Sequence, residues 1–591
     1  MVNTIRLTLC LLIASITSLS YGQDLQKIRG WNILSDSYAD DIETINTAKA
    51  YNINHLQLSH RLVMDLREIR DPERNNLVNE LISKAHDAGI KEVVVWDHAL
   101  YDLNYYPGQF KTGPGGTINL DNQAFWEWFK KDYRDMLTLV PGVDGLVLTF
   151  IETGARAENQ YSVKLKTGPE KLAAVVDAIG DVVCEELGKK LYIRTFAYTD
   201  AEYKNTIGCI DYIKSDKIIL MMKETPHDFF LTHPTDKYAG TINRPTIMEF
   251  DACNEFNGQG VIANTWPEYI LKRWSDLIRR PNVIGYVART DRYGDTRLVG
   301  TPNEILLYSL KRYSEDQTIS ADEIYDEFIS SKYGKKAVRF LKPAFMKAYD
   351  IISSSLYTLG TNVANHSKLD FDPYKSSYGR HVSGKWIDPP VVFIGHGVNK
   401  EFHYWTDIIE HIAPARFKTP EAGLNVEAPK VIKNNWITPV EKMDERYLKH
   451  IIAEKHFGVK SAEKASRLAD KANPFLNEND SRLITNLFYR TLLTARVYEA
   501  SATAYFGYRV YARGEEYQTK WLKKTMKRAL DDILVISDEI DSYREKVPQG
   551  QWNWRGDAAI AREYHKKITE TGWKEYRNVV FNPSPALHDL P

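Results

Sequence analysis

The sequence predicts an α/β protein, a (β/α)8 TIM barrel followed by a mainly α-helical C-terminal domain. From about residue 27 to 310, short apolar runs alternate with amphipathic stretches, which is the pattern of repeated β/α units around a parallel sheet. Eight such units can be counted, the number that closes a barrel. After residue 312 this alternation gives way to helical periodicity. With 591 residues, the chain is also too long for one ordinary domain.

The eight predicted strands are short and mostly apolar. They span residues 28–34, 55–58, 92–96, 145–151, 190–197, 217–222, 246–250 and 283–288. Between them, amphipathic patterns predict helices such as residues 40–50, 73–88, 123–139 and 169–187, the last with apolar residues at i, i+3 and i+4. Strands that alternate with helices favour a parallel sheet.

The domain boundaries predicted from these patterns are a signal peptide at residues 1–22, the barrel at 23–312 and the helical domain at 313–591. In the helical domain, residues 321–359 are predicted to form two helices, and residues 440–571 are mostly helical, with long runs around 480–513 and 517–546. The segment between them, 360–428, is irregular and rich in Gly, Pro, His and aromatic residues. A loop of that length is usually functional or disordered, and its composition favours a functional segment that reaches back over the barrel mouth.

The first 22 residues have the features of a secretory signal peptide. Arg6 provides the positive start, and residues 7–16 form an apolar run too short to span a bilayer. Ser20, Tyr21 and Gly22 then provide a small-residue cleavage site. No later segment is apolar enough to cross a membrane. We expect a secreted or periplasmic protein.

The charge balance and the cysteine content exclude several classes of function. Lys and Arg total 77 against 78 Asp and Glu, so a net charge of -1 gives no overall field to attract nucleic acid or an anionic membrane. Cys184, Cys209 and Cys253 are widely spaced and lack metal-ligand spacing, so we expect buried small hydrophobic residues. Neither a metal nor another cofactor is expected. The 13 Trp and 35 Tyr residues suit a groove in which sugar rings stack on aromatic side chains.

Glu152 is the first candidate for a catalytic residue. It ends the apolar run that follows Asp144 and Gly145, and active sites of TIM barrels lie at the carboxyl ends of the strands. A carboxyl group in a partly apolar barrel mouth has its charged form disfavoured, so it can donate a proton to a departing glycosidic oxygen. The alternative is a structural glutamate that pairs with an arginine such as Arg194.

Two later strand ends carry further polar side chains. Lys223, Pro226, Asp228 and Phe229 follow the sixth predicted strand. The end of the seventh predicted strand and the segment after it contain a longer series: Glu249, Phe250, Asp251, Asn254, Glu255, Phe256, Gly258, Gln259 and then Trp266. Because alternate residues of a barrel strand face the lumen and the helices, we expect one or two of Glu249, Asp251 and Glu255 at the site.

These three segments together resemble the α-glucuronidases of glycoside hydrolase family 67, over roughly residues 140–315. The resemblance implies that Glu152 is the general acid, that Lys223 neutralises a uronate carboxylate and that Asp228 binds sugar hydroxyls. The chain also departs from the family pattern. It has Thr232 and His233 where the family has an Arg-Glu pair. Pro267 replaces a lysine of the family, and Leu271, Lys272 and Arg273 replace the acidic run that follows that lysine, so the family's base has no matching residue here. The family's N-terminal β-domain is absent as well, so the sequence is that of a divergent relative.

Two other strand ends are candidates independently of this resemblance. Asp97 and His98 end the third predicted strand, before a loop rich in Tyr and Phe. Asp97 is equally compatible with a capping carboxylate. After the eighth strand, Arg289, Asp291 and Asp295 combine positive charge for an acidic sugar with two carboxylates, and a solvated charged loop is the alternative. His60, after the second strand, would complete the rim of the mouth.

Three functions are compatible with these candidates. The first is a secreted glycoside hydrolase that acts on uronate-containing poly- or oligosaccharides. In it, Glu152 is the acid and its partner carboxylate is Asp97, Glu249, Asp251 or Asp295, whose separation from Glu152 would distinguish inversion from retention. The remaining candidates, His98, Lys223, Asp228, Glu255, Trp266, Arg289 and Asp291, would bind substrate.

The second is an elimination enzyme, a lyase or an oligosaccharide dehydratase on fragments of an algal uronate polysaccharide such as ulvan. There Lys223 and Arg289 would stabilise the carboxylate while a Tyr, His or Lys takes the α-proton. The third is a non-catalytic glycan-binding protein. In every case the expected partner is an acidic oligosaccharide, and the helical domain offers a surface for a homodimer.

Overall fold

The computed structural model describes residues 28–197, 200–226, 228–294, 296–358, 369, 410, 412–417, 444–511, 513–546 and 557–570. In these residues the chain forms a closed barrel of eight parallel strands, in the order β1 to β8, with β8 returning to pair with β1. The strands are β1 (Ile28–Ile33), β2 (His55–Leu58), β3 (Glu92–His98), β4 (Gly145–Thr149), β5 (Lys190–Arg194), β6 (Ile219–Lys223), β7 (Thr246–Phe250) and β8 (Val283–Arg289). A helical region follows them. The predicted fold class is therefore confirmed.

Each strand lies where the sequence predicts it, and most of the differences are at the carboxyl ends; β6 also begins at Ile219, two residues after its predicted start at 217. β3 continues to His98, two residues beyond its predicted end, whereas β4 and β5 end at Thr149 and Arg194, before theirs. The early end of β4 has a local cause, since Glu152 adopts a left-handed backbone with φ of 63°. A non-glycine residue in that conformation cannot continue a strand.

The helices between the strands are α2 (Tyr38–Ala48), α3 (Pro72–Asp87), α4 (Gln123–Thr138), α5 (Gly168–Gly180), α6 (Asp200–Cys209), α7 (Pro267–Leu277) and α8 (Ile305–Glu315). The helices α3, α4 and α5 begin with a side-chain cap. Asp71 accepts a hydrogen bond from the backbone N–H of Arg74 at the start of α3, and Thr167 and Glu170 form a capping box on α5. The helix predicted at 169–187 changes after α5 into a π-helical turn, Asp181–Glu186.

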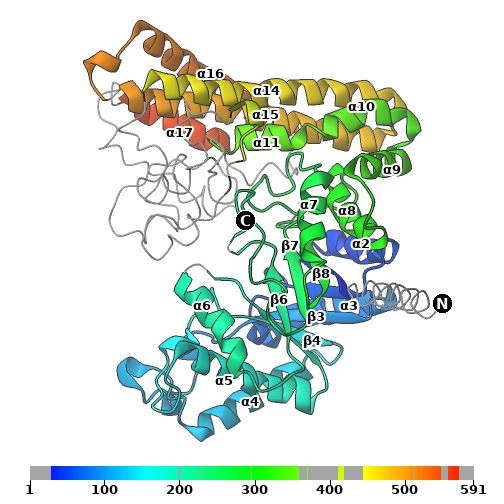
Figure 1. Cartoon of the computed structure of the whole chain (residues 1–591), viewed down its shortest axis with the longest axis vertical. Helices are drawn as coiled ribbons and strands as arrows, with labels where there is room; N and C mark the ends of the chain where they lie inside the picture. Colours follow the sequence, from blue (N-terminus) through cyan, green and yellow to red (C-terminus); the bar gives the residue numbers. More distant parts are fainter. Residues whose placement is uncertain are drawn as a thin grey trace, which may run out of the picture.

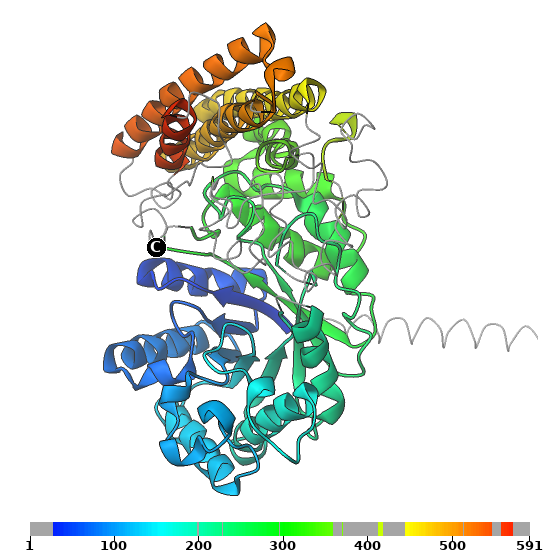
Figure 2. The same cartoon turned by 90° about the vertical axis from the view of Figure 1, so that its left-hand side faces the viewer.

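The helical domain consists, in the described residues, of α9 (Ala321–Tyr333), α10 (Lys335–Phe345), α11 (Ala348–Ser355), α14 (Glu445–Ala472), α15 (Glu478–Tyr511), α16 (Lys520–Lys546) and α17 (Asp557–Glu570). Residues 321–359, predicted as two helices, form three. Gly334, with φ of +86°, separates α9 from α10. Figures 1 and 2 show the long helices stacked beside one another at one end of the molecule and the barrel at the other. Most of the predicted irregular loop 360–428 and the predicted signal peptide lie outside the described residues.

The barrel lumen is closed in its middle by a layer of side chains from alternate strand positions. This layer consists of Val94, Trp96, Val147, Tyr192, Ile219, Met221, Ile247 and Val287. The intervening strand residues, such as Val93 and Val95, belong to the larger core between the strands and the helices. A residue two positions after a member of the layer therefore faces the lumen at the carboxyl ends of the strands.

The helical domain is attached to the barrel through the segments that follow β6 and β7. The hydroxyl of Tyr357, just after α11, donates to Asn257 Oδ1 at 2.7 Å and accepts from the backbone N–H of Leu231 at 3.0 Å. On α15, Arg490 Nε donates to the carbonyl of Val261 at 2.7 Å. Because both segments leave the carboxyl ends of their strands, the helical domain lies on the same side of the barrel as the lumen mouth.

Two further observations concern the described residues as a whole. None of their helices combines the length and apolarity needed to cross a membrane. Cys184, Cys209 and Cys253 are free, buried thiols.

Tyr357→Phe tests the junction between the domains. The variant leaves the Leu231 N–H and the Asn257 amide oxygen without this partner in a buried place, so the free energy of unfolding is expected to fall by about 1–3 kcal/mol. Urea denaturation measures the change. Tyr212→Phe is the matched control, because Tyr212 is 50% exposed and its loss should change stability by no more than about 0.5 kcal/mol. Equal effects of the two substitutions would contradict the assigned role.

Candidate active site

The alternation of strand residues brings four charged side chains into the lumen mouth. Arg194, Lys223, Glu249 and Arg289 each lie two positions after a member of the lumen layer, on β5, β6, β7 and β8. All four are almost completely buried. Three of them, Lys223, Glu249 and Arg289, are predicted from the sequence as site residues, and the structure brings these three together.

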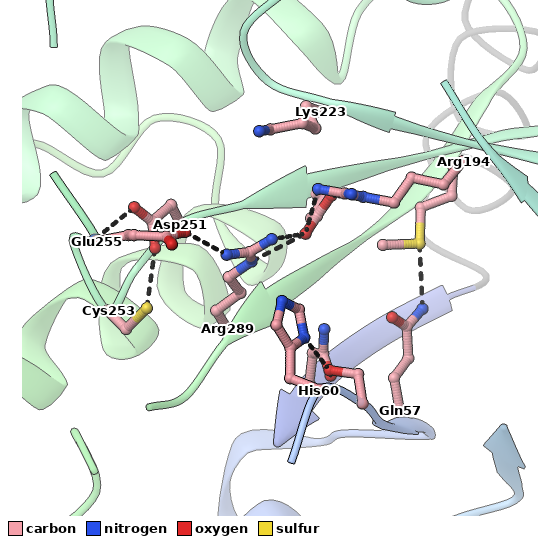
Figure 3. Close-up of polar contacts among 12 residues, drawn as sticks. Gln57, His60, Arg194, Lys223, Asp251, Cys253, Glu255 and Arg289 are labelled. Carbon is pink, nitrogen blue, oxygen red and sulfur yellow. Dashed lines mark hydrogen bonds and ion pairs between the residues drawn. The ribbon is translucent and has the colours of Figure 1, made fainter. Parts of the chain in front are cut away.

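Glu249 is held between two arginines. Arg194 Nε donates to Glu249 Oε2 at 2.6 Å, and Arg289 Nε donates to Oε1 at 2.9 Å. Figure 3 shows the guanidinium groups of Arg194 and Arg289 turned toward each other. Burial alone would raise the pKa of Glu249, but the charges of Arg194, Arg289 and Lys223 outweigh it and hold that pKa below its ordinary value. Glu249 is therefore an ionised anchor for both guanidinium groups.

The segment after β7 extends this network of charges. Glu255 accepts from Arg289 Nη1 at 2.7 Å and from Arg292 Nε at 2.8 Å. Asp251 in turn accepts from the backbone N–H of Glu255 at 2.7 Å and from Cys253 Sγ at 2.9 Å (Figure 3). Burial raises the pKa of Asp251 to about 6. Asp251 thus holds Glu255 in the position from which it contacts both arginines.

Lys223 has a mixed polar and aromatic environment. Its Nζ lies 3.0 Å from Asp228 Oδ1 and about 4 Å from the ring centroids of Phe196 and Phe229, at 4.1 and 3.9 Å. Burial lowers the pKa of the Lys223 ammonium, and the charge of Asp228 opposes that shift. Lys223 and Asp228, both predicted as binding residues, therefore form one pair at the end of β6.

Glu152 and His98 form the more open side of the mouth. Glu152 is exposed, whereas His98 is buried and its Nδ1 lies 2.6 Å from the carbonyl oxygen of Met64. A carbonyl can only accept, so Nδ1 carries the proton and Nε2 of the neutral ring is unprotonated. Burial lowers the pKa of His98, while the negative charge of Glu152 acts to raise it. The two side chains thus interact electrostatically.

His60 lies on the rim close to the arginines. Its Nδ1 is 2.9 Å from Ser59 Oγ, and its ring centroid is 5.1 Å from that of Trp96. Burial, followed by the charges of Arg289, Arg292 and Arg194, lowers the pKa of His60 well below its ordinary value. Like Glu152, His60 has a left-handed backbone, with φ of 53°. Strained residues of this kind concentrate at functional sites, and two of them lie at this mouth.

The structure does not bring every predicted residue to the mouth. Asp97 is on the face of β3 that is turned toward the helices, where it accepts from the hydroxyls of Tyr101 and Tyr133 and from the N–H of Leu66, at 2.8, 2.5 and 2.9 Å. Asp97 is therefore a capping carboxylate, the alternative that the sequence allows, and it does not face the lumen.

Asp291 has a similar structural role. It accepts from the N–H groups of Leu34 and Ser35 at 2.9 and 2.8 Å, and so joins the ends of β8 and β1. Trp266 precedes α7 and packs against Tyr349 on α11, away from the lumen. The remaining candidate, Asp295, lies outside the described residues.

Other residues at the mouth have weaker signals in the sequence. The sequence indicates Arg194 only as a structural partner of Glu152, whereas in the structure it donates to Glu249. The alternation of β5 would have indicated its lumen position, because Arg194 follows Tyr192 by two residues. Arg292 and Phe196 lie beyond the strand ends, where no periodicity predicts direction.

The arrangement does not provide a metal site within the described residues. No group of three or more His, Cys, Asp or Glu side chains there is placed to hold an ion. What the mouth offers is a proton donor or acceptor at Glu152, two imidazoles, and buried cations that can face an anionic ligand.

Comparisons with known proteins concern the fold. No protein-family model matches the chain, and no curated protein matches its sequence. Among solved structures, a GH138 enzyme targeting pectin rhamnogalacturonan II superposes with a TM-score of 0.56 at 12% identity, over 94% of this chain and 69% of that one. The chain therefore shares the fold of a glycoside hydrolase.

Two further likenesses have TM-scores below 0.5. A GH115 4-O-methyl-α-glucuronidase with specificity for decorated arabinogalactans gives 0.46 at 9% identity, over 95% of this chain and 63% of that one. An O-GlcNAc hydrolase mutant of Thermobaculum terrenum gives 0.44 at 10% identity, over 94% and 100% of the two chains. The resemblance to family 67 stays a prediction.

His60→Asn tests the electrostatics of the mouth. The folded pKa of His60 is depressed, whereas the unfolded chain binds this proton below a pKa of about 6.5. Stability attributable to His60 is therefore lost as the pH falls below that value. Asn tolerates the left-handed backbone and does not titrate. Between pH 7 and 5, urea denaturation should show the wild type losing up to about 1.4 kcal/mol per pH unit relative to the variant. Parallel stability curves would mean that His60 is protonated as easily in the folded protein as in the unfolded one.

Proposed function

We propose that the chain is a glycoside hydrolase that acts on uronate-containing oligo- or polysaccharides, with the lumen mouth as its active site. The observation that supports this most is the placement of one exposed carboxylate, Glu152, and an interacting imidazole, His98, beside buried cations at the carboxyl ends of the strands. The fold shared with a glycoside hydrolase is consistent with it.

Glu152 is assigned as the general acid. Its exposure lets it reach a bound substrate, and the left-handed backbone turns it out of the strand direction. As the glycosidic bond breaks, the proton of the Glu152 carboxyl passes to the departing oxygen, which would otherwise leave as an alkoxide. His98 supports this role because its ring lies within the field of the Glu152 charge.

Asp251 is the partner carboxylate that we favour. Glu249 has both oxygens engaged by arginines, and Asp97 faces away from the lumen. Asp251 directly follows β7 and lies within the field of the Arg289 charge. Its pKa of about 6 leaves it mostly ionised near neutral pH and able to accept a proton from water.

The specificity for a uronate is assigned to Lys223 and Arg289. A sugar carboxylate at the mouth can accept a hydrogen bond from the ammonium of Lys223. This ammonium has three donor hydrogens and one contact to an acceptor, Asp228 Oδ1. Arg289 is already fixed by Glu249 and Glu255, so its charge is positioned before any ligand binds. Charge-assisted bonds of this kind select an acidic sugar over a neutral one.

Elimination is the second candidate function, and the two histidines favour it. His60 and His98 both have lowered pKa values, so both are neutral bases near neutral pH. A neutral imidazole can take the proton next to the uronate carboxyl group while the cations stabilise the charge that develops there. Hydrolysis adds water to the products, whereas elimination leaves an unsaturated uronate that absorbs in the near ultraviolet. Mass and absorbance of the products from acidic plant and algal oligosaccharides distinguish the two reactions.

Glu152→Gln is the direct test of the acid. The variant keeps the size and hydrogen bonding of the side chain but has no transferable proton, so turnover should fall by about 10²–10⁴ with little change in ligand affinity. Initial rates and equilibrium binding on the same oligosaccharide measure both. Glu127→Gln, an exposed change on α4, should leave turnover intact. Near-native turnover of Glu152→Gln would refute the assignment.

Lys223→Met tests the specificity. The substitution keeps the apolar stem between Phe196 and Phe229 and removes the charge. Binding of a uronate oligosaccharide is expected to weaken about tenfold or more, while its carboxyl-reduced, neutral analogue should be affected much less. Isothermal titration calorimetry gives both affinities. An equal loss for the two ligands would show that Lys223 does not contact the carboxylate.

A further inference from the structure

A cavity lies outside the barrel lumen, where the barrel meets the helical domain. Its volume is about 480 Å³, within the range of about 300–1,000 Å³ that is typical of small-molecule sites. The walls come from the segment after β6, from α7, and from the chain around α11 (Figure 1). The lining residues that matter most are Leu231, Thr235, Trp266, Tyr269, Arg273 and Tyr349.

This cavity is separate from the lumen mouth. Lys223 is the last residue of β6 and faces the lumen, whereas the next residue, Glu224, is turned toward α7. Glu224 Oε2 is 3.4 Å from Arg273 Nε on α7. The barrel wall thus stands between the Arg273 side chain and the charges of the mouth, and no residue assigned to the proposed active site lines the cavity.

One side of the cavity is aromatic. The ring centroids of Tyr269 and Tyr349 are 6.4 Å apart with an interplanar angle of 32°, and Trp266 packs edge-on against Tyr349 at 5.8 Å. Trp266 is fully buried, whereas Tyr269 and Tyr349 are only partly buried. Their rings therefore present aromatic surface to a ligand, and flat sugar faces pack well on such surfaces.

Arg273 supplies the polar group. It is 6% exposed, its Nη2 donates to the carbonyl of His233, and its guanidinium lies 4.5 Å from the ring centroid of Tyr269. Its Nη1 is buried and has no hydrogen-bond partner among the described residues. Burial raises the pKa of Glu224 to about 7, so this carboxylate offsets the charge of Arg273 only in part near neutral pH. A buried guanidinium nitrogen in this state calls for an acceptor.

We propose that this cavity is an accessory binding site for a single uronate residue. The sugar ring packs against Tyr269 and Tyr349, and its carboxylate faces the guanidinium of Arg273, which lines the cavity. Lys272, Glu268, Asp276 and Glu410, which also line the cavity, offer partners for the hydroxyl groups. The choice of a uronate rests on the proposed function, because an acidic glycan that enters the mouth would present further uronates to the same side of the barrel.

The test is a titration of the full chain with sodium D-glucuronate, followed by saturation-transfer NMR, with D-glucose as the neutral comparison. Lys223→Met serves as the background because it weakens binding at the mouth. In that background, Tyr349→Ala should weaken glucuronate binding about tenfold or more through loss of the aromatic platform. Thr235→Trp, which fills the cavity without removing an aromatic wall, should do the same. Tyr212→Ala, an exposed tyrosine elsewhere on the barrel, is the matched control and should have no effect.

Unchanged glucuronate affinity in both cavity variants would overturn the proposal, and so would equal binding of glucose and glucuronate. The result is independent of turnover. Tyr349→Ala should keep the activity of the mouth, and Glu152→Gln should keep glucuronate binding in the cavity. If no acidic glycan is turned over but the cavity variants still bind glucuronate more weakly, the proposed function is wrong and the proposed binding site is supported.

Discussion

The mouth of the barrel depends on one buried carboxylate, Glu249. Two arginines, one from β5 across the lumen and one from the adjacent strand β8, donate to it, and a guanidinium without such a partner would be costly to bury. Arg289 then extends the network to Glu255, and Glu255 extends it to Arg292. Removal of the Glu249 charge would take from Arg194 its carboxylate partner in the lumen and leave Arg289 paired with Glu255 alone. The side chains around the network, including His60 and Lys223, take their pKa values in part from it.

This network also explains why a helical domain is attached at this end. The segment after β7 begins with Asp251 and Glu255, which face the arginines, and continues to Asn257, Val261 and Ala263. These last residues are bound to the helical domain, through Tyr357, Arg490 and Thr491 respectively. One short segment is therefore fixed at both ends. A change in the packing of the helical domain would reach the arginines through it, so the domain has a structural role in the site even where it contributes no side chain.

The two candidate reactions make different use of the same mouth. Hydrolysis needs a second carboxylate that can accept a proton, and of the described candidates Asp251 has the most suitable pKa and lies at the carboxyl end of β7. Elimination needs a neutral base beside cations, which the depressed pKa values of His60 and His98 provide. Both reactions require an acidic sugar to be held in place, and the buried cations serve that need in either case. The proposed accessory site adds an aromatic surface and a buried arginine outside the lumen.

The sequence by itself determined the barrel. Short apolar runs that alternate with amphipathic ones favour a parallel sheet, and eight such units favour a closed barrel. The eight strands lie within a few residues of their predicted places. It also indicated Lys223, Glu249 and Arg289, because polar residues at the carboxyl ends of parallel strands meet at one mouth. What the sequence could not determine was the direction of each side chain. Asp97 and His98 are adjacent, yet the first faces the helices and hydrogen-bonds to tyrosines, while the second lies near Glu152. Only the tertiary structure decided which carboxylates form ion pairs with arginines, since those contacts join β5, β7 and β8 across the lumen. The spacing of residues along the chain does not give the distances between strands that come together only when the barrel closes.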